Sequence, residues 1–151
     1  MQKDETMNAL RLLVQSCIDA EGEYDECARH TLNVELRELF AYRAQACREE
    51  AAQLEAAARN IGGRLEHRGS VRGAAHRGWM ALRSSLSANG DGVLLEECER
   101  GEEAALTRYR GALGGPLPES VRHLVFKHYE LARHTRDQLR ALRARMVVAA
   151  S

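Results

Sequence analysis

The sequence predicts an all-α protein folded as a four-helix bundle. Ala, Leu, Glu and Arg dominate the composition, and these residues favour long helices over sheets. Proline occurs only at Pro116 and Pro118. Apolar residues recur at intervals of three and four along four long segments, as amphipathic helices require. Because 151 residues lie within the usual range of one domain, we expect a single domain over residues 1–151.

Local breakers divide the chain into the expected helices. Asn33 is suited to cap the start of the second helix. Either Gly62 or Gly63 can take the left-handed conformation that ends it. Residues 88–92 read as a turn, and Pro118 suits a first helical position. The expected long helices cover residues 5–29, 34–61, 92–113 and 118–147, and a shorter helix covers 70–87.

Each long helix carries a heptad-like stripe that should face the interior. In the last helix the expected stripe passes through Val121, Leu124, His128, Leu131 and Thr135. The stripes are apolar except at a few positions. Those polar positions are Glu21, Arg43, Glu50, Glu102 and His128.

The depth of these polar residues along the bundle follows from the turns. Folding the first two helices about the turn near residue 32 places Glu21 level with Arg43, and the turn near Gly115 places Glu102 level with His128. The sequence therefore predicts a buried polar layer in which Glu21 and Arg43 satisfy one another as a hydrogen-bonded ion pair. Its members are Glu21, Arg43, Glu102 and His128, with Cys17 and Cys47 about one turn away and Glu50 nearer the far end.

The polar layer does not have the signature of a di-iron site. Such sites use Glu-x-x-His on two helices, and none of the six histidines has a glutamate three residues earlier. An inward arginine would also repel a metal cation. We therefore expect no cofactor and no enzymatic activity. The alternative is a redox bundle or one that binds iron, manganese or zinc, with ligands drawn from Cys17, Glu21, Cys47, Glu50, Glu102 and His128.

The third helix concentrates glutamates around Gly101. Those that lie mostly off the stripe, Glu96, Glu97, Glu99 and Glu103, are expected to form a solvated acidic face. Gly101 precedes Glu102 and should let the crossover helix or another neighbour approach closely.

Several segments resemble a bacterial family of ferritin-like four-helix bundles of unknown function. They are LVQSCIDAEGEY (13–24), IGG (61–63), GSVRGAAHRGWMALRSSL (69–86) and LLEECERGEEAALTRYRGAL (94–113), and the HRGW and ERGE pieces are the most specific. The resemblance implies an up-down bundle with a long crossover between its second and third helices, and it implies no activity. Family members often have glutamate where this chain has Gln53, and His-Asp where it has Arg136-Asp137.

The short helix over 70–87 fits that crossover. About 17 residues at 1.5 Å each span roughly 25 Å, a large part of a bundle's length. Trp79 is then expected to be a packing anchor laid over the bundle.

Charge and hydropathy indicate the environment and partners. The 22 basic and 22 acidic residues balance, so no global field attracts nucleic acid or anionic lipid. There is no apolar run of membrane-spanning length and no signal-peptide core, which predicts a cytoplasmic protein without membrane contact. The four cysteines are widely spaced and are expected to be free thiols. Basic stretches at 64–83 and 133–145 are able to contact nucleic acid, an anionic surface or the acidic face of a second copy. With zero net charge we favour salt-bridged helix faces or a homo-oligomer such as a dimer, and binding to nucleic acid or a membrane surface is the third alternative. The predicted role is structural or interaction-based, with a stress association as one option.

Overall fold

The computed structural model describes residues 2–65 and 90–150, and all regular structure in these ranges is helical. The four helices in the described ranges are α1 (Gln2–His30), α2 (Val34–Asn60), α4 (Gly90–Leu113) and α5 (Glu119–Ala150). The predicted all-α class with four long helices is confirmed. The predicted bounds differ from the observed ones by at most three residues. The expected helix over 70–87, with Trp79, lies outside the described residues.

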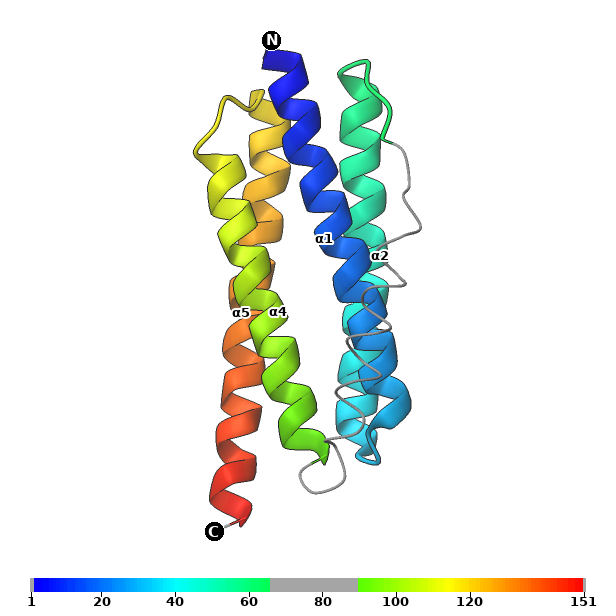
Figure 1. Cartoon of the computed structure of the whole chain (residues 1–151), viewed down its shortest axis with the longest axis vertical. Helices are drawn as coiled ribbons and strands as arrows, with labels where there is room; N and C mark the ends of the chain where they lie inside the picture. The colour runs from blue at the N-terminus through cyan, green and yellow to red at the C-terminus, as the bar shows by residue number, and fades with distance from the viewer. Residues whose placement is uncertain (1, 66–89, 151) are drawn as a thin grey trace.

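The helices lie side by side and alternate in direction within two hairpins (Figure 1). One hairpin is α1 with α2, and the other is α4 with α5. The hairpins meet mainly along α1 and α4, whereas α2 and α5 approach each other at few places. The end of α2 and the start of α4 lie at opposite ends of the molecule, so these two helices run in the same direction (Figure 1).

The expected caps are present at the ends of α2. The Asn33 side chain accepts a hydrogen bond from the Leu36 N–H at 3.1 Å. At the other end Gly62 takes the left-handed conformation, with φ of 84°. Gly63 is needed for a different reason: a Cβ there would lie 2.2 Å from the Met7 sulfur. Gly62 thus provides the left-handed residue of the turn, and Gly63 allows the close approach of Met7.

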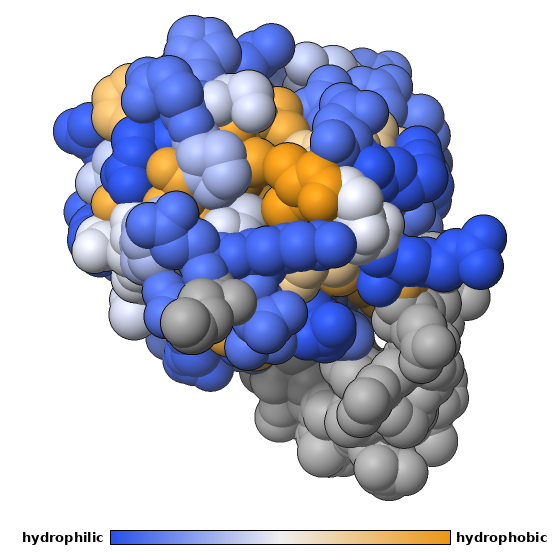
Figure 2. Space-filling model, turned by 90° about the horizontal axis from the view of Figure 1, so that it is seen from above, coloured by the Kyte–Doolittle hydropathy of each residue, from blue (hydrophilic) through white to orange (hydrophobic). Residues whose placement is uncertain are grey.

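The core consists of two apolar clusters, one toward each end of the bundle. The first includes Leu10, Leu54 and Leu106, and it extends to the end where α1 begins, where apolar residues show among polar ones (Figure 2). The second includes Phe40 and Leu95.

The inward stripe of α5 differs from the predicted one. Its buried residues are Val121, Val125, His128, Ala132, Thr135 and Leu139, whereas Leu131 is 42% exposed. The expectation for Leu131 was therefore wrong by one position, whereas Leu124 is partly buried and packs against the first core cluster. Two heptad series share His128 and Thr135, and spacing alone does not separate them.

No helix in the described part of the chain is both long and apolar enough to cross a lipid bilayer.

Candidate functional site

The polar interior centres on Glu102 of α4, whose side chain is buried. The Tyr24 hydroxyl of α1 donates to Oε1 of Glu102 at 2.7 Å. A guanidinium nitrogen of Arg43, from α2, lies 3.9 Å from the same oxygen. The Arg43 guanidinium also lies 5.8 Å from the centroid of the Tyr24 ring, within range of a cation–π contact. Three helices thus contribute to one buried contact, which we call the Tyr24–Arg43–Glu102 cluster.

The ion pair in this cluster crosses the bundle diagonally. Arg43 is on α2 and Glu102 on α4, and these helices are not neighbours. Both side chains are removed from solvent, with relative exposures of 7% and 6%. A charge in such a place costs several kcal/mol unless a partner and hydrogen bonds compensate it. The Nε atom of Arg43 makes no hydrogen bond to the described residues, so the compensation is incomplete.

The charge states in the cluster follow from burial and from the ion pair. Burial acts to lower the pKa of Arg43, but Glu102 and then Tyr24 raise it, and the net change is upward. Arg43 is therefore a permanent cation inside the bundle. Burial raises the pKa of Glu102 above its ordinary value, and Arg43 and the Tyr24 hydroxyl lower it only in part.

Glu50 is a second buried carboxyl, and it lies within electrostatic reach of the cluster. Its side chain is buried within α2, with a relative exposure of 7%. Burial raises its pKa to about 7, Arg43 opposes the rise and Glu102 adds to it. Glu50 is therefore a carboxyl that titrates near neutral pH, far above the usual range of glutamate.

The two thiols expected near the polar layer, Cys17 and Cys47, are buried within electrostatic reach of Glu50. Burial, and then Glu50, raise the pKa of Cys17 to about 12. Burial also raises the pKa of Cys47 well above its ordinary value, although Arg43 acts in the opposite direction. Both thiols therefore stay protonated at neutral pH, and a protonated thiol is a weak nucleophile and a poor metal ligand.

His128 is buried on the other side of the bundle, between α2 and α5. Its Nε2 donates to the side-chain oxygen of Gln53 at 2.7 Å. Burial, and then Lys127, lower the pKa of His128 to about 4, so the ring is neutral at physiological pH. The Nδ1 atom has no hydrogen-bond partner among the described residues. The structure thus gives His128 a contact with Gln53, which was not among the predicted site residues.

Glu21 lies elsewhere than the predicted layer required. Its carboxylate accepts a hydrogen bond from Arg48 at 2.9 Å and is partly exposed, so the expected pair with Arg43 does not form. Arg43 turns instead to Glu102 and Tyr24. The inward position of α1 at this depth belongs to Tyr24, which is buried and was not among the predicted polar residues.

Gly101 accommodates another glutamate of α1. A Cβ at Gly101 would lie 3.0 Å from a carboxylate oxygen of Glu23. Burial, and then Glu97, Glu102 and Asp19, raise the pKa of Glu23 to about 8, while Arg100 lowers it. The close neighbour expected at Gly101 is therefore a protonated carboxyl side chain. Spacing did not predict the burial of Glu23, because Glu23 lies one residue before the buried Tyr24, outside the inward stripe of α1.

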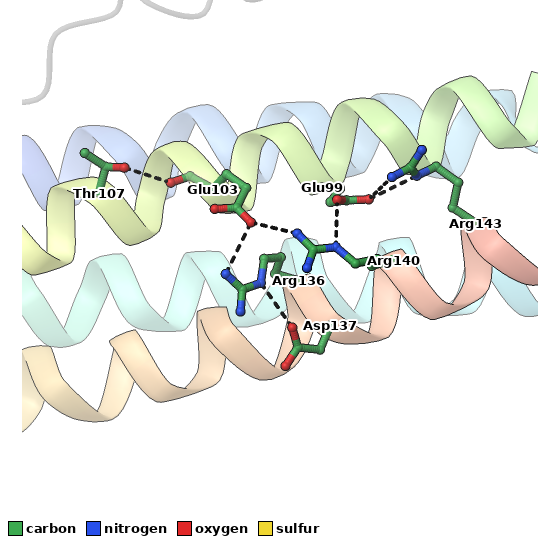
Figure 3. A network of polar contacts seen from close by, with 7 residues as sticks. All are labelled: Glu99, Glu103, Thr107, Arg136, Asp137, Arg140 and Arg143. Atoms are coloured by element: carbon green, nitrogen blue, oxygen red, sulfur yellow. Dashed lines mark hydrogen bonds and ion pairs between the residues drawn. The ribbon is translucent and has the colours of Figure 1, made fainter.

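The outward glutamates of α4 bind arginines of α5 (Figure 3). Glu99 accepts from Arg140 at 3.1 Å and from Arg143 at 3.0 Å. Glu103 accepts from Arg140 at 3.0 Å and from Arg136 at 3.2 Å. We call these five residues the outer network. Glu99 is buried beneath the arginines, so its assignment to a solvated acidic face was wrong.

A protein-family model matches most of the chain, and the matched residues include the Tyr24–Arg43–Glu102 cluster. A family model described as a domain of unknown function, DUF2383, matches residues 5–115. The chain belongs to the DUF2383 family. No curated protein matches it. The DUF2383 match includes Glu50, Cys17 and Cys47 but ends before His128 and the arginines of the outer network.

The interior of this DUF2383 chain does not fit a two-metal centre. Among the described residues, no group of three or more His, Cys, Asp or Glu side chains is arranged to hold a metal ion. The Glu102 oxygen that faces the interior already accepts from Tyr24 and faces Arg43. A divalent cation placed there would be repelled by a guanidinium that cannot lose its proton.

Proposed function

We propose that this protein is a non-enzymatic, ferritin-like helical bundle with a structural or protein-interaction role. The single observation that carries the proposal is the Arg43 guanidinium beside Glu102, because it supplies inside the bundle the positive charge that a metal would bring. The ferritin-like topology is supported by α2 and α4, which run in the same direction and so need a long connection.

Burial of the polar groups supports a role without catalysis. Arg43, Glu50, Glu102 and His128 are all buried. A substrate would have to open the bundle to touch them. General acid–base catalysis also needs a group within hydrogen-bond reach of the reacting atoms. The ring nitrogen of His128 that donates is already bound to Gln53. These groups are better suited to fixing helix register than to turnover.

Association of the protein with itself is part of the same proposal. The formal net charge is zero, so copies do not repel one another through a global field. Large apolar side chains of α1, α2 and α5 are exposed, among them Leu12, Tyr42 and Phe126. We propose a cytoplasmic homo-oligomer, which sedimentation equilibrium of the purified protein tests directly.

Metal content is the experiment that tests the proposed function. Untagged protein would be purified without chelators, incubated with Fe(II), Mn(II) or Zn(II), dialysed, and assayed by elemental analysis. We expect far less than one metal ion per chain. Stoichiometric metal that is lost in Glu102→Ala, but retained in the surface control Glu103→Ala, would overturn the proposal.

A metal-binding or redox role is the second candidate, and Glu50 is the observation that favours it. Its carboxyl is buried within electrostatic reach of the thiols of Cys17 and Cys47. All three are acceptable zinc ligands, although the described structure does not arrange them as a metal site. Binding would require the thiols to lose their protons and Arg43 to turn away. Zinc that disappears in Glu50→Ala but persists in Glu49→Ala would favour this candidate over the first.

A further inference from the structure

A pair of thiols outside the polar cluster lies where α1 meets α4. The sulfur atoms of Cys27 and Cys98 are 3.3 Å apart. Both residues belong to the second core cluster, with relative exposures of 0% and 2%. All four cysteines are free, and this is the one sulfur–sulfur contact among the described residues. A disulfide has sulfur atoms about 2.05 Å apart, so a small movement of the two side chains would allow a bond.

Hydrogen bonds on both sides of the pair hold α1 and α4 in register. About one turn toward the start of α1, Tyr24 donates to Glu102 at 2.7 Å. In the other direction Thr31, just after the end of α1, donates to Asp91 at 2.6 Å, about one turn from Cys27 and two turns from Cys98. These contacts, with the cysteines between them, follow one antiparallel seam. The seam keeps Cys27 opposite Cys98, so their contact is a consequence of helix register.

Cys17 and Cys47 provide an internal comparison. They lie on α1 and α2, the two helices of one hairpin, and the described structure shows no sulfur–sulfur contact between them. Cys27 and Cys98 are 71 residues apart and lie on different hairpins. A covalent bond that closes such a long loop restricts the unfolded chain more than one within a hairpin.

We propose that Cys27 and Cys98 form an intramolecular disulfide on exposure to a peroxide, joining the α1–α2 hairpin to the α4–α5 hairpin. The site thus takes hydrogen peroxide or a small organic hydroperoxide as its oxidant.

The reaction is a two-electron oxidation of two thiols. One sulfur, as the thiolate, attacks a peroxide oxygen, the O–O bond breaks, and the departing hydroxide takes up the proton that the thiol lost. The product is a sulfenic acid and one water. The second thiolate then attacks the sulfenic sulfur, the S–S bond forms, and the S–O bond breaks with release of a second water. Two thiols and one hydrogen peroxide become one disulfide and two waters.

Burial of the two sulfur atoms should limit the rate of this oxidation. Both sulfur atoms are shielded, and burial raises the pKa of Cys98 well above its ordinary value. The thiolate forms, and peroxide enters, only when the seam opens locally. Oxidation should therefore be slower than that of an exposed thiol, and it should give a single cross-link because the partner sulfur is already adjacent.

The test is a peptide map of the full-length protein after peroxide treatment. Wild-type protein would be exposed to hydrogen peroxide, quenched with catalase, alkylated in denaturant and digested without reductant. We expect two of the four thiols to escape alkylation, and a peptide containing Cys27 linked to one containing Cys98. Dithiothreitol should restore both thiols. The oxidised form should melt on the order of 10 °C higher than the reduced form.

Two double variants serve as matched controls. Cys17→Ala with Cys47→Ala should still form the cross-link, whereas Cys27→Ala with Cys98→Ala should form no intramolecular disulfide. The wild-type map decides the matter even if a variant fails to fold. The proposal is overturned if that map links Cys17 to Cys47 or joins separate chains. It also fails if Cys27 and Cys98 end as sulfinic acids or remain alkylatable.

Discussion

Helix α4 carries two kinds of glutamate, and the contrast between them explains much of this molecule. Glu102 points inward to Tyr24 and one arginine, at 2.7 and 3.9 Å. Glu99 and Glu103 point to α5 and share three arginines at 3.0–3.2 Å (Figure 3). The outer network therefore has the shorter ion pairs and more of them. The ion pair of Arg43 with Glu102, which we call the inner pair, is longer, and its two side chains are almost fully removed from water.

We expect burial, and not the number of contacts, to decide how much each ion pair contributes to stability. Exposed ion pairs contribute about 0–1 kcal/mol each, because water and salt screen them. A buried pair adds little over a good apolar packing, but the loss of one partner leaves a charge with no solvent to stabilise it. The inner pair should therefore be sensitive to single substitutions, and the outer network tolerant of them.

The largest expected effect comes from breaking the inner pair. Arg43→Met keeps an unbranched side chain, although a shorter one, and removes its charge, which leaves Glu102 buried without its cation. We expect a loss of about 3–5 kcal/mol in the free energy of unfolding, measured by urea denaturation. The matched control is Arg140→Met in the outer network. A loss below about 1 kcal/mol for Arg43→Met would place the inner pair in the same class as a surface pair.

An intermediate effect is expected from Glu50, through pH. Its pKa is raised from the model-peptide value of 4.5 to about 7, so the folded state binds the proton more tightly than the unfolded state. The contribution of Glu50 to the free energy of unfolding is therefore fully present below pH 4.5, and it is lost as the pH rises through about 7. Glu50→Gln should therefore be more stable than wild type at pH 8, on the order of 2–3 kcal/mol.

The measurement for Glu50 is urea denaturation of both proteins across this pH range. The difference between Glu50→Gln and wild type should grow with pH, whereas Glu49→Gln, on the exposed neighbour, should run parallel to wild type. Parallel curves for all three proteins would mean that Glu50 is not held protonated in the fold.

The smallest effect should come from the outer network. Arg140 contacts both Glu99 and Glu103, yet about half of its side chain is exposed. Arg140→Ala should cost less than about 1 kcal/mol in thermal or urea unfolding, and the cost should shrink further in high salt. A loss of several kcal/mol that persists in high salt would show that the two kinds of glutamate do not differ as described.

The sequence was sufficient to predict the helices and which arginine is buried. Breakers such as Asn33 and Gly62 set the bounds of α2, and heptad spacing placed Arg43, Glu50, Glu102 and His128 inside. These predictions depend on local geometry, which residue spacing encodes directly.

It was harder to predict which residue each polar side chain contacts. Spacing along a helix gives the direction of a side chain, but not how far the side chain extends. Arg43 was matched by depth to Glu21, but its long side chain extends across the bundle to Glu102. Glu21 instead contacts Arg48, which lies further along α2. The contact between Gln53 and His128 depends on how two hairpins dock, which no pattern within one helix records.

A double-mutant cycle between Arg43 and Glu102 tests the central claim most directly. It compares the free energies of unfolding of wild type, Arg43→Met, Glu102→Gln and the double variant. We predict that the double variant is more stable than Arg43→Met alone, with a coupling energy of about 2 kcal/mol or more, because removal of both charges leaves none unpaired. Effects that add to within about 0.5 kcal/mol would contradict the claim that Arg43 neutralises Glu102 inside the bundle.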